Sequence, residues 1–105
     1  MSDTIDGLTI NYEEEGILKV KELDKVVLSK GAWTTILFRF LTWDAAKNTY
    51  KGPAYAIRRY QKRDGVYQLK GKFNISSNDQ AQKIVDTLST WLAEPSVDGA
   101  IPEDA

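Results

Sequence analysis

The sequence predicts an α+β domain in which four antiparallel strands are followed by one amphipathic helix. Strand-like runs fill residues 17–75, and an apolar stripe with helical spacing follows over residues 81–92. Between the last two strand-like runs stands an Asp64-Gly65 pair, a dipeptide that strongly favours a hairpin turn. With a single helix available, we expect it to cover one face of the sheet and to leave the other face open.

The strand prediction rests on β-branched and aromatic residues between turn signals. The strongest run is WTTILFRFLTW, residues 33–43, which contains neither glycine nor proline. The other predicted strands are residues 17–29, 54–62 and 66–75. Turns are expected at Lys30-Gly31, at residues 48–53 and at residues 63–65.

The predicted helix begins at a capping box. Ser77 is suited to accept a hydrogen bond from the amide of Gln80, while the Gln80 side chain reaches back. Pro95 ends the element soon after its last apolar residue. The stripe consists of Ala81, Ile84, Val85, Leu88, Trp91 and Leu92.

Charge is distributed unevenly along a chain of 105 residues whose net charge is only −1. Every one of the 14 basic residues lies between Lys19 and Lys83, and only six acidic residues accompany them within residues 17–92. The charged residues of 1–16 and of 93–105 are all acidic. We interpret these two segments as acidic tails around one domain, residues 17–92. A basic body between acidic ends indicates a polyanionic partner.

Composition argues against catalysis. The chain has no cysteine and no histidine, so it lacks the thiol nucleophile and the commonest general base near neutral pH. Its aspartates are scattered, and no phosphate-binding glycine pattern is present. We therefore expect no enzyme, no cofactor and no metal site. An acidic, polar start and the lack of a long apolar run favour a cytoplasmic protein without membrane contact.

The richest concentration of positive charge is the predicted hairpin over residues 54–76. Its six basic residues are Arg58, Arg59, Lys62, Arg63, Lys70 and Lys72. Which of them share a face depends on the turn, since strand side chains alternate. A three-residue turn places Arg58, Tyr60 and Lys62 beside Lys70 and Lys72. We prefer this turn because it sends Ile57 inward with Leu69 and Phe73, which belong to the apolar face of the last strand. A two-residue Asp64-Gly65 turn instead aligns Arg59 and Gln61 with these lysines.

A polar sheet face with several cations and a central tyrosine suits single-stranded nucleic acid. Unpaired bases stack on aromatic rings while lysine and arginine follow the phosphates. Duplex DNA is more naturally read by a helix in the major groove, and the predicted helix has few cations on its polar side. The alternative is a non-catalytic interaction module whose basic face docks an acidic protein.

Trp33 and Trp43 lie on one face of the strongest strand, opposite Ile36, Phe38 and Phe40. Both faces of this strand are largely apolar. We therefore expect these tryptophans in the core or at a subunit contact, with base stacking as the second interpretation. Gly71 is a lone strand glycine, which is typical of a bulge or a close approach.

The order of these elements resembles a known family. The segments AYAIRRY and LKGKFNISSNDQAQKIVDTL, within residues 25–92, are similar to the single-stranded-DNA-binding transcriptional coactivators of the positive-cofactor-four type. The plant Whirly proteins and small bacterial and cyanobacterial domains share that fold. Tyr55, Ile57, Arg58 and Tyr60 match an aromatic-x-Ile-Arg-x-aromatic pattern, and Lys70-Gly71 matches a Lys-Gly pair.

The resemblance implies a curved four-stranded sheet, a homodimer formed with the help of the helices, and Arg58 as a nucleic-acid contact. It also implies a role as a cofactor in transcription or DNA maintenance. Residues and resemblance together predict a homodimeric protein that binds single-stranded DNA or RNA. The predicted contacts are Arg58, Tyr60, Lys62, Lys70 and Lys72, with Arg59, Arg63 and Arg39 near by.

Overall fold

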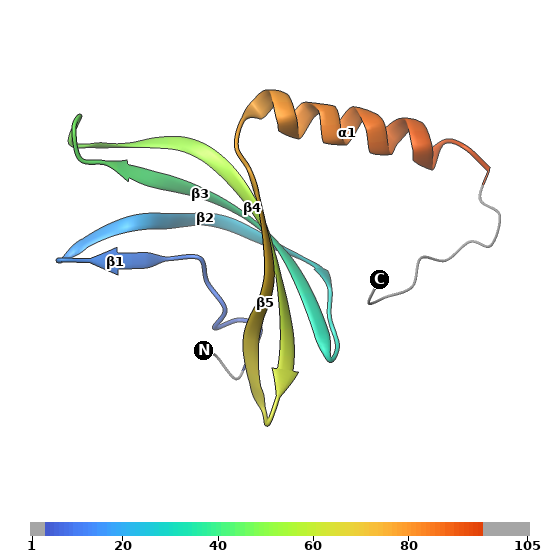
Figure 1. The fold of residues 1–105 in the computed structure, drawn as a ribbon, viewed down its shortest axis with the longest axis horizontal. Helices are drawn as coiled ribbons and strands as arrows, with labels where there is room; N and C mark the ends of the chain where they lie inside the picture. The colour runs from blue at the N-terminus through green and yellow to red at the C-terminus, as the bar shows by residue number, and fades with distance from the viewer. Residues whose placement is uncertain (1–3, 96–105) are drawn as a thin grey trace.

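The computed structural model describes residues 4–95, which form one curled antiparallel sheet and one helix (Figure 1). The α+β class and the single C-terminal helix are as predicted, whereas the sheet has five strands instead of four. The elements in chain order are β1 (Tyr12–Glu14), β2 (Ile17–Ser29), β3 (Trp33–Asp44), β4 (Thr49–Arg63), β5 (Val66–Ile75) and α1 (Asn78–Leu92).

The sheet is a simple meander in which each strand pairs with its neighbours in the chain, in the order β1-β2-β3-β4-β5. β1 and β5 are therefore the edge strands. The turn predicted over residues 48–53 is shorter than expected, because β4 already begins at Thr49 and pairs there with Asp44. A register shift near Gly52 and Pro53 accommodates these two residues within the strand.

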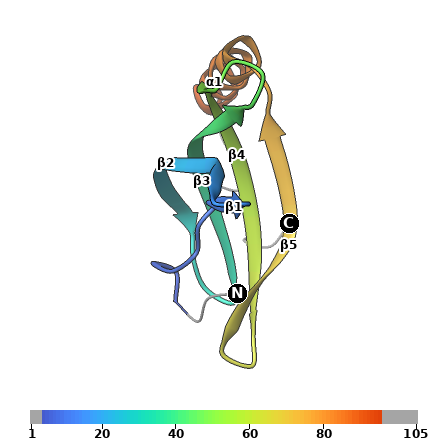
Figure 2. The same ribbon diagram turned by 90° about the vertical axis from the view of Figure 1, so that its left-hand side faces the viewer.

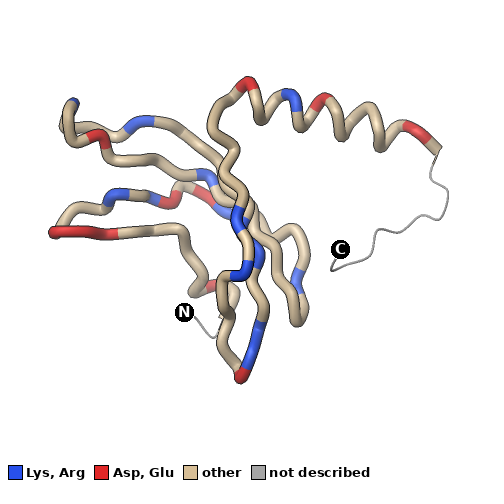
Figure 3. The backbone as a smooth tube through the Cα atoms, viewed as in Figure 1, with Lys and Arg blue, Asp and Glu red and all other residues tan. Residues whose placement is uncertain are grey.

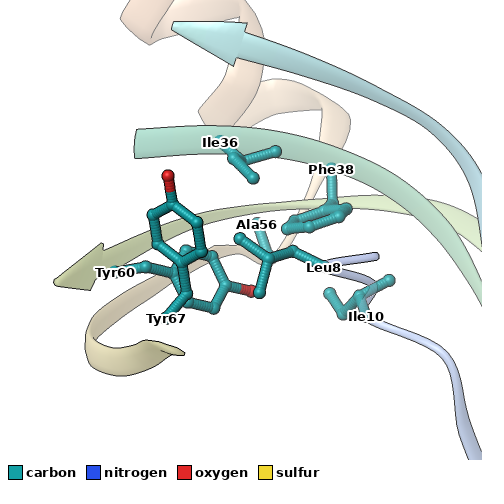
Figure 4. Close-up of a cluster of buried hydrophobic side chains, with 7 residues drawn as sticks. All are labelled: Leu8, Ile10, Ile36, Phe38, Ala56, Tyr60 and Tyr67. Carbon is teal, nitrogen blue, oxygen red and sulfur yellow. The ribbon is translucent and has the colours of Figure 1, made fainter. Parts of the chain in front are cut away.

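The core lies on one face of the sheet, here called the inner face. Ile36 and Phe38 of β3 and Ala56 of β4 are fully buried there. They pack with residues from the N-terminal segment, residues 4–11, and from the β4–β5 hairpin (Figure 4). The complete cluster is Leu8, Ile10, Ile36, Phe38, Ala56, Tyr60 and Tyr67.

The N-terminal segment differs from the tail predicted for residues 1–16. Leu8 and Ile10 are buried against the inner face, and Tyr12–Glu14 form β1. The tail was predicted because the charged residues of this segment are all acidic. However, the alternating Leu8 and Ile10 cover apolar area of the inner face that water would otherwise contact. The segment thus takes the place that was expected for the helix.

Lys25 of β2 anchors the N-terminal segment. Its ammonium donates to the backbone oxygens of Ile5, Asp6 and Leu8 at 3.1, 3.1 and 2.7 Å. These carbonyls converge because residues 4–8 form a turn, in which the Gly7 and Leu8 amides donate to the oxygens of Thr4 and Ile5. An ammonium has three N–H donors, so this contact uses all of them.

Replacing Lys25 by methionine should loosen this anchor. Methionine keeps most of the apolar stem but offers no donor to the three carbonyls, and hydrogen bonds to charged groups are the stronger ones. We expect the free energy of unfolding to fall by about 1–3 kcal/mol in denaturant titrations. The exposed Lys30→Met is the control and should change it by less than about 0.5 kcal/mol. Equal effects of both substitutions would contradict the anchoring role.

The β4–β5 hairpin closes with a two-residue turn, so the preferred three-residue turn was wrong. Arg63 pairs with Val66, and only Asp64 and Gly65 lie between them, with φ of 52° and 78°. Two consecutive left-handed residues define a type I′ turn, whose twist matches that of the flanking strands. This advantage outweighs the burial of Ile57 that favoured the longer turn.

A bulge in β5 then changes the register. Tyr60 pairs with Leu69 but Arg59 pairs with Gly71, so Lys70 has no partner on β4. The inserted residue reverses the alternation, so that odd-numbered residues of β5 face one side of the sheet before Lys70 and the other side after it. Such a reversal is what the bulge expected at Gly71 implies. Tyr67 and Leu69 point to the inner face, whereas Phe73 lies on the opposite, outer face. The prediction that these apolar residues share one face was therefore wrong.

The capping box is confirmed. Ser77 Oγ accepts from the Gln80 amide at 3.1 Å, while Gln80 Oε1 accepts from the Ser76 amide at 2.9 Å. The side chain of Gln80 therefore reaches one residue further back than expected, and α1 starts at Asn78 as its cap requires.

The helix does not cover the sheet, contrary to the prediction. It projects from the end of β5, away from both faces (Figures 1 and 2), and none of its described residues is buried. The Tyr55 hydroxyl and the Asn78 side chain form a hydrogen bond of 3.2 Å where helix and sheet meet. Among residues 4–95, no helix is long and apolar enough to cross a lipid bilayer.

Candidate nucleic-acid interface

Positive charge gathers on the β4–β5 hairpin (Figure 3), and Asp64 lies in the turn at its tip. None of the six cations of the hairpin forms an ion pair or a hydrogen bond through its side chain within residues 4–95. Their charge is therefore not neutralised inside the described part of the chain. Unpaired cations crowded on one hairpin repel each other, and an anion that binds there relieves the repulsion.

The inner face carries one part of this charge. Arg58 pairs with Lys72 across the strands, and Lys62 lies nearer the turn on the same face. The two-residue turn alone would have separated Arg58 from Lys72, but the extra residue at the bulge brings them together. Lys62 lies over the Tyr67 ring, with its Nζ 5.3 Å from the ring centroid. Three predicted contacts thus share the inner face.

Tyr60, the central aromatic of the prediction, is not available for stacking. It is only 5% exposed, because the core cluster surrounds its ring. Burial raises the pKa of its phenol above the ordinary value, the neighbouring Arg58 opposes this shift, and Glu22 adds to it. The hydroxyl therefore stays protonated near neutral pH. Its role is in the core, which corrects the prediction of a base-stacking tyrosine.

Arg59 and Arg39 lie on the outer face, away from Arg58. The Arg59 guanidinium stacks on the Trp33 indole, with its Cζ 4.3 Å from the ring centroid. Arg39 is exposed and pairs in register with Tyr55. Sequence alternation therefore divides the predicted cations between two faces of the same sheet.

The remaining predicted cations lie at the rim of the hairpin. Lys70 is exposed in the bulge of the edge strand β5, and Arg63 is exposed beside the turn. They can be reached from solvent without passing over either face. The edge of β5 thus links the inner cations to those of the outer face.

Two arginines contain buried nitrogen atoms without a hydrogen-bond partner, Nε of Arg58 and Nη2 of Arg59. A buried donor without an acceptor is costly, and native structures rarely leave one unsatisfied. The other guanidinium nitrogens of these arginines form no hydrogen bond within residues 4–95 either. These two nitrogen atoms are shielded from solvent, so packing holds both side chains in place, and only the remaining guanidinium nitrogens can donate to an acceptor from outside.

Sequence reasoning missed the contact between Trp33 and Arg59 and the exposure of Phe73, which is 50% exposed on the outer face. Alternation placed Trp33 correctly opposite Ile36 and Phe38, but the partner strand was not known. Gly71 was the feature of the sequence from which the outward orientation of Phe73 could have been predicted, because a bulge at that point reverses the faces of the side chains that follow it.

The described residues offer no arrangement for metal binding: among residues 4–95, no three Asp or Glu side chains gather to hold an ion. The hairpin instead presents nitrogen donors and apolar rings. Such a set can bind phosphates and bases.

These observations define an α+β protein with a curled five-stranded sheet, a projecting helix and a basic hairpin. Comparisons with family models, with curated proteins and with solved structures find no match to the chain. The resemblance to positive-cofactor-four-type coactivators therefore stays a prediction.

Proposed function

We propose that this protein binds single-stranded nucleic acid through the β4–β5 hairpin and acts as a homodimer. The observation that carries the proposal is the set of six hairpin cations without an acidic partner within residues 4–95. A polyanion supplies the missing negative charge, and those guanidinium nitrogens of Arg58 and Arg59 that are not buried have no partner within residues 4–95 and can donate to phosphate oxygens.

A single strand suits this hairpin better than a duplex. The cations lie on two faces and around the edge of one strand pair, and a flexible chain can follow such a path. A rigid duplex is read by an element that enters a groove, yet the exposed polar side of α1 offers only Lys83 among acidic neighbours Asp79 and Asp86. The exposed Phe73 ring adds a surface on which an unpaired base can stack.

The helix supplies the reason for a homodimer. Its apolar stripe is exposed to solvent, with Trp91 63% and Leu88 48% exposed. A stripe of this kind on a projecting helix is stable when another apolar surface covers it. A second copy of the same helix offers an identical stripe, so a two-fold pairing buries both at once.

We extend the proposal to the cellular role and location that the sequence predicts. Strands β2–β5 followed by α1 have the order of four strands and a helix that the resemblance implies, with β1 as an additional edge strand, and this order supports a cofactor role in transcription or DNA maintenance. A cytoplasmic location fits such a role. The alternative function is docking of an acidic protein, and the same unpaired cations favour it.

The test is a fluorescence-anisotropy titration of labelled oligo-dT with wild type and with Arg58→Ala/Lys72→Ala. We expect the wild type to bind less tightly as salt rises. The logarithm of its association constant should fall with the logarithm of the salt concentration, with a slope of about −0.7 per phosphate contacted. The double variant should bind at least about tenfold more weakly and show a slope reduced by about 1.4.

The control variant Lys47→Ala/Lys83→Ala removes two exposed cations outside the hairpin and should leave the affinity within about twofold. Binding of an acidic peptide in preference to oligo-dT would support the alternative. Absence of oligo-dT binding near 50 mM salt would refute the proposed function.

A further inference from the structure

The outer face has a vacant position beside Arg59. Its partner on β5 is Gly71, which has no side chain, and on β3 it pairs with Thr35. The Arg59 side chain leans toward β3, where its guanidinium stacks on Trp33. The surface above Gly71 is therefore not filled by the residue directly opposite.

Groups that suit a nucleobase surround this position. Phe73 follows two residues after Gly71 on the same face and is half exposed. The stacked guanidinium of Arg59 offers a flat cationic surface on the other side. Gln61 and Gln68 pair with each other in the next outward-facing register pair, and their amides form no hydrogen bond within residues 4–95.

The chemistry of these groups is that of base recognition in single strands. Bases stack on aromatic rings and on arginine planes, while amide side chains donate to and accept from base edges. The phosphates have their own binding groups. Lys70 at the edge and Lys72 on the inner face are the two residues that flank Gly71 in the sequence. A strand that crosses the edge of β5 would thus keep its phosphates on these lysines and turn a base to the outer face.

We propose that the outer face holds a subsite for one unstacked nucleobase, located over Gly71 between the Arg59–Trp33 pair and Phe73. This inference rests on the proposed function and deepens it, because it separates base recognition from phosphate binding. It gives Gly71 a second role besides the bulge, that of leaving room for the base.

Gly71→Val tests the subsite without changing any charge. A β-carbon at Gly71 would lie 3.9 Å from the β-carbon of Arg59, which is an ordinary contact, and no left-handed φ is required there. We therefore expect the variant to fold, which circular dichroism and thermal unfolding check. Its branched side chain should occupy the subsite. Phe73→Thr is a second variant, which removes the stacking ring and introduces a β-branched residue that favours a strand.

The probes are labelled oligo-dT and an abasic strand of equal length that has the same phosphates without bases. We expect wild type to bind oligo-dT about 5- to 100-fold more tightly than the abasic strand. Both variants should lose most of this difference while their affinity for the abasic strand stays within twofold. Thr49→Val, at the far end of β4, is the control and should bind both strands as wild type does.

The outcomes separate the two proposals. If wild type binds both strands equally, or if folded Gly71→Val keeps the full preference for oligo-dT, the subsite is refuted while phosphate binding stands. If wild type binds neither strand, the proposed function falls and the subsite falls with it.

Discussion

Phe38→Ala is expected to lower the free energy of unfolding by about 3–5 kcal/mol. Phe38 has no exposed surface, and it lies at the centre of the inner-face cluster between β3, β4 and the N-terminal segment. Truncation removes a whole ring from a core whose other side is formed by the N-terminal segment, through Leu8, Ile10 and the partly buried Ile5. Urea or guanidinium titrations at one fixed protein concentration measure the loss, because association would couple to stability.

Phe73→Ala provides the matched control, since the same atoms are removed from the opposite face. Phe73 is half exposed, so we expect a loss of about 1–2 kcal/mol. A loss at Phe73 as large as that at Phe38 would contradict the assignment of the core to the inner face.

Leu88→Glu/Trp91→Glu should convert the expected dimer into a monomer. Both residues lie on the exposed apolar stripe of α1, and a pairing of two helices would bury both. In the proposed dimer each would bury enough apolar area to act as a hot spot, so the dimer dissociation constant should rise at least about 1000-fold. Light scattering after size exclusion should show a wild-type mass of about twice 11.8 kDa and a variant mass near 11.8 kDa.

The control for this experiment is Gln82→Glu/Thr90→Glu, which adds the same charge on the polar side of α1. It should remain dimeric. A wild-type protein that is monomeric at high micromolar concentration, or a control that dissociates equally, would exclude the helix stripe as the dimer contact.

Local patterns in the sequence predicted the elements well but not their packing. The Asp64-Gly65 turn, the Ser77 cap and the faces of β3 follow from neighbours in the chain, and such short-range rules were sufficient for them. The error in the hairpin came from choosing the turn by burial of Ile57, although the type I′ geometry of Asp64-Gly65 is the stronger local constraint.

The place of the helix and of the N-terminal segment could not be predicted in this way. Both segments have apolar side chains that can cover a face of the sheet, and the sequence pattern alone does not show which of the two covers it. Leu8 and Ile10 occupy the inner face, so the stripe of α1 remains exposed. For the candidate site, the bulge at Lys70 decided which cations share a face, and one inserted residue is enough to reverse that outcome.

The meander has a consequence for how the chain folds. Because every strand pairs with its sequence neighbour, the hairpins need only short loops to close, and low contact order favours rapid folding. The core is the exception, since Leu8 packs in one cluster with Tyr60 and Tyr67. During synthesis, Leu8 must therefore wait for β5, the last strand of the sheet, before its burial is complete.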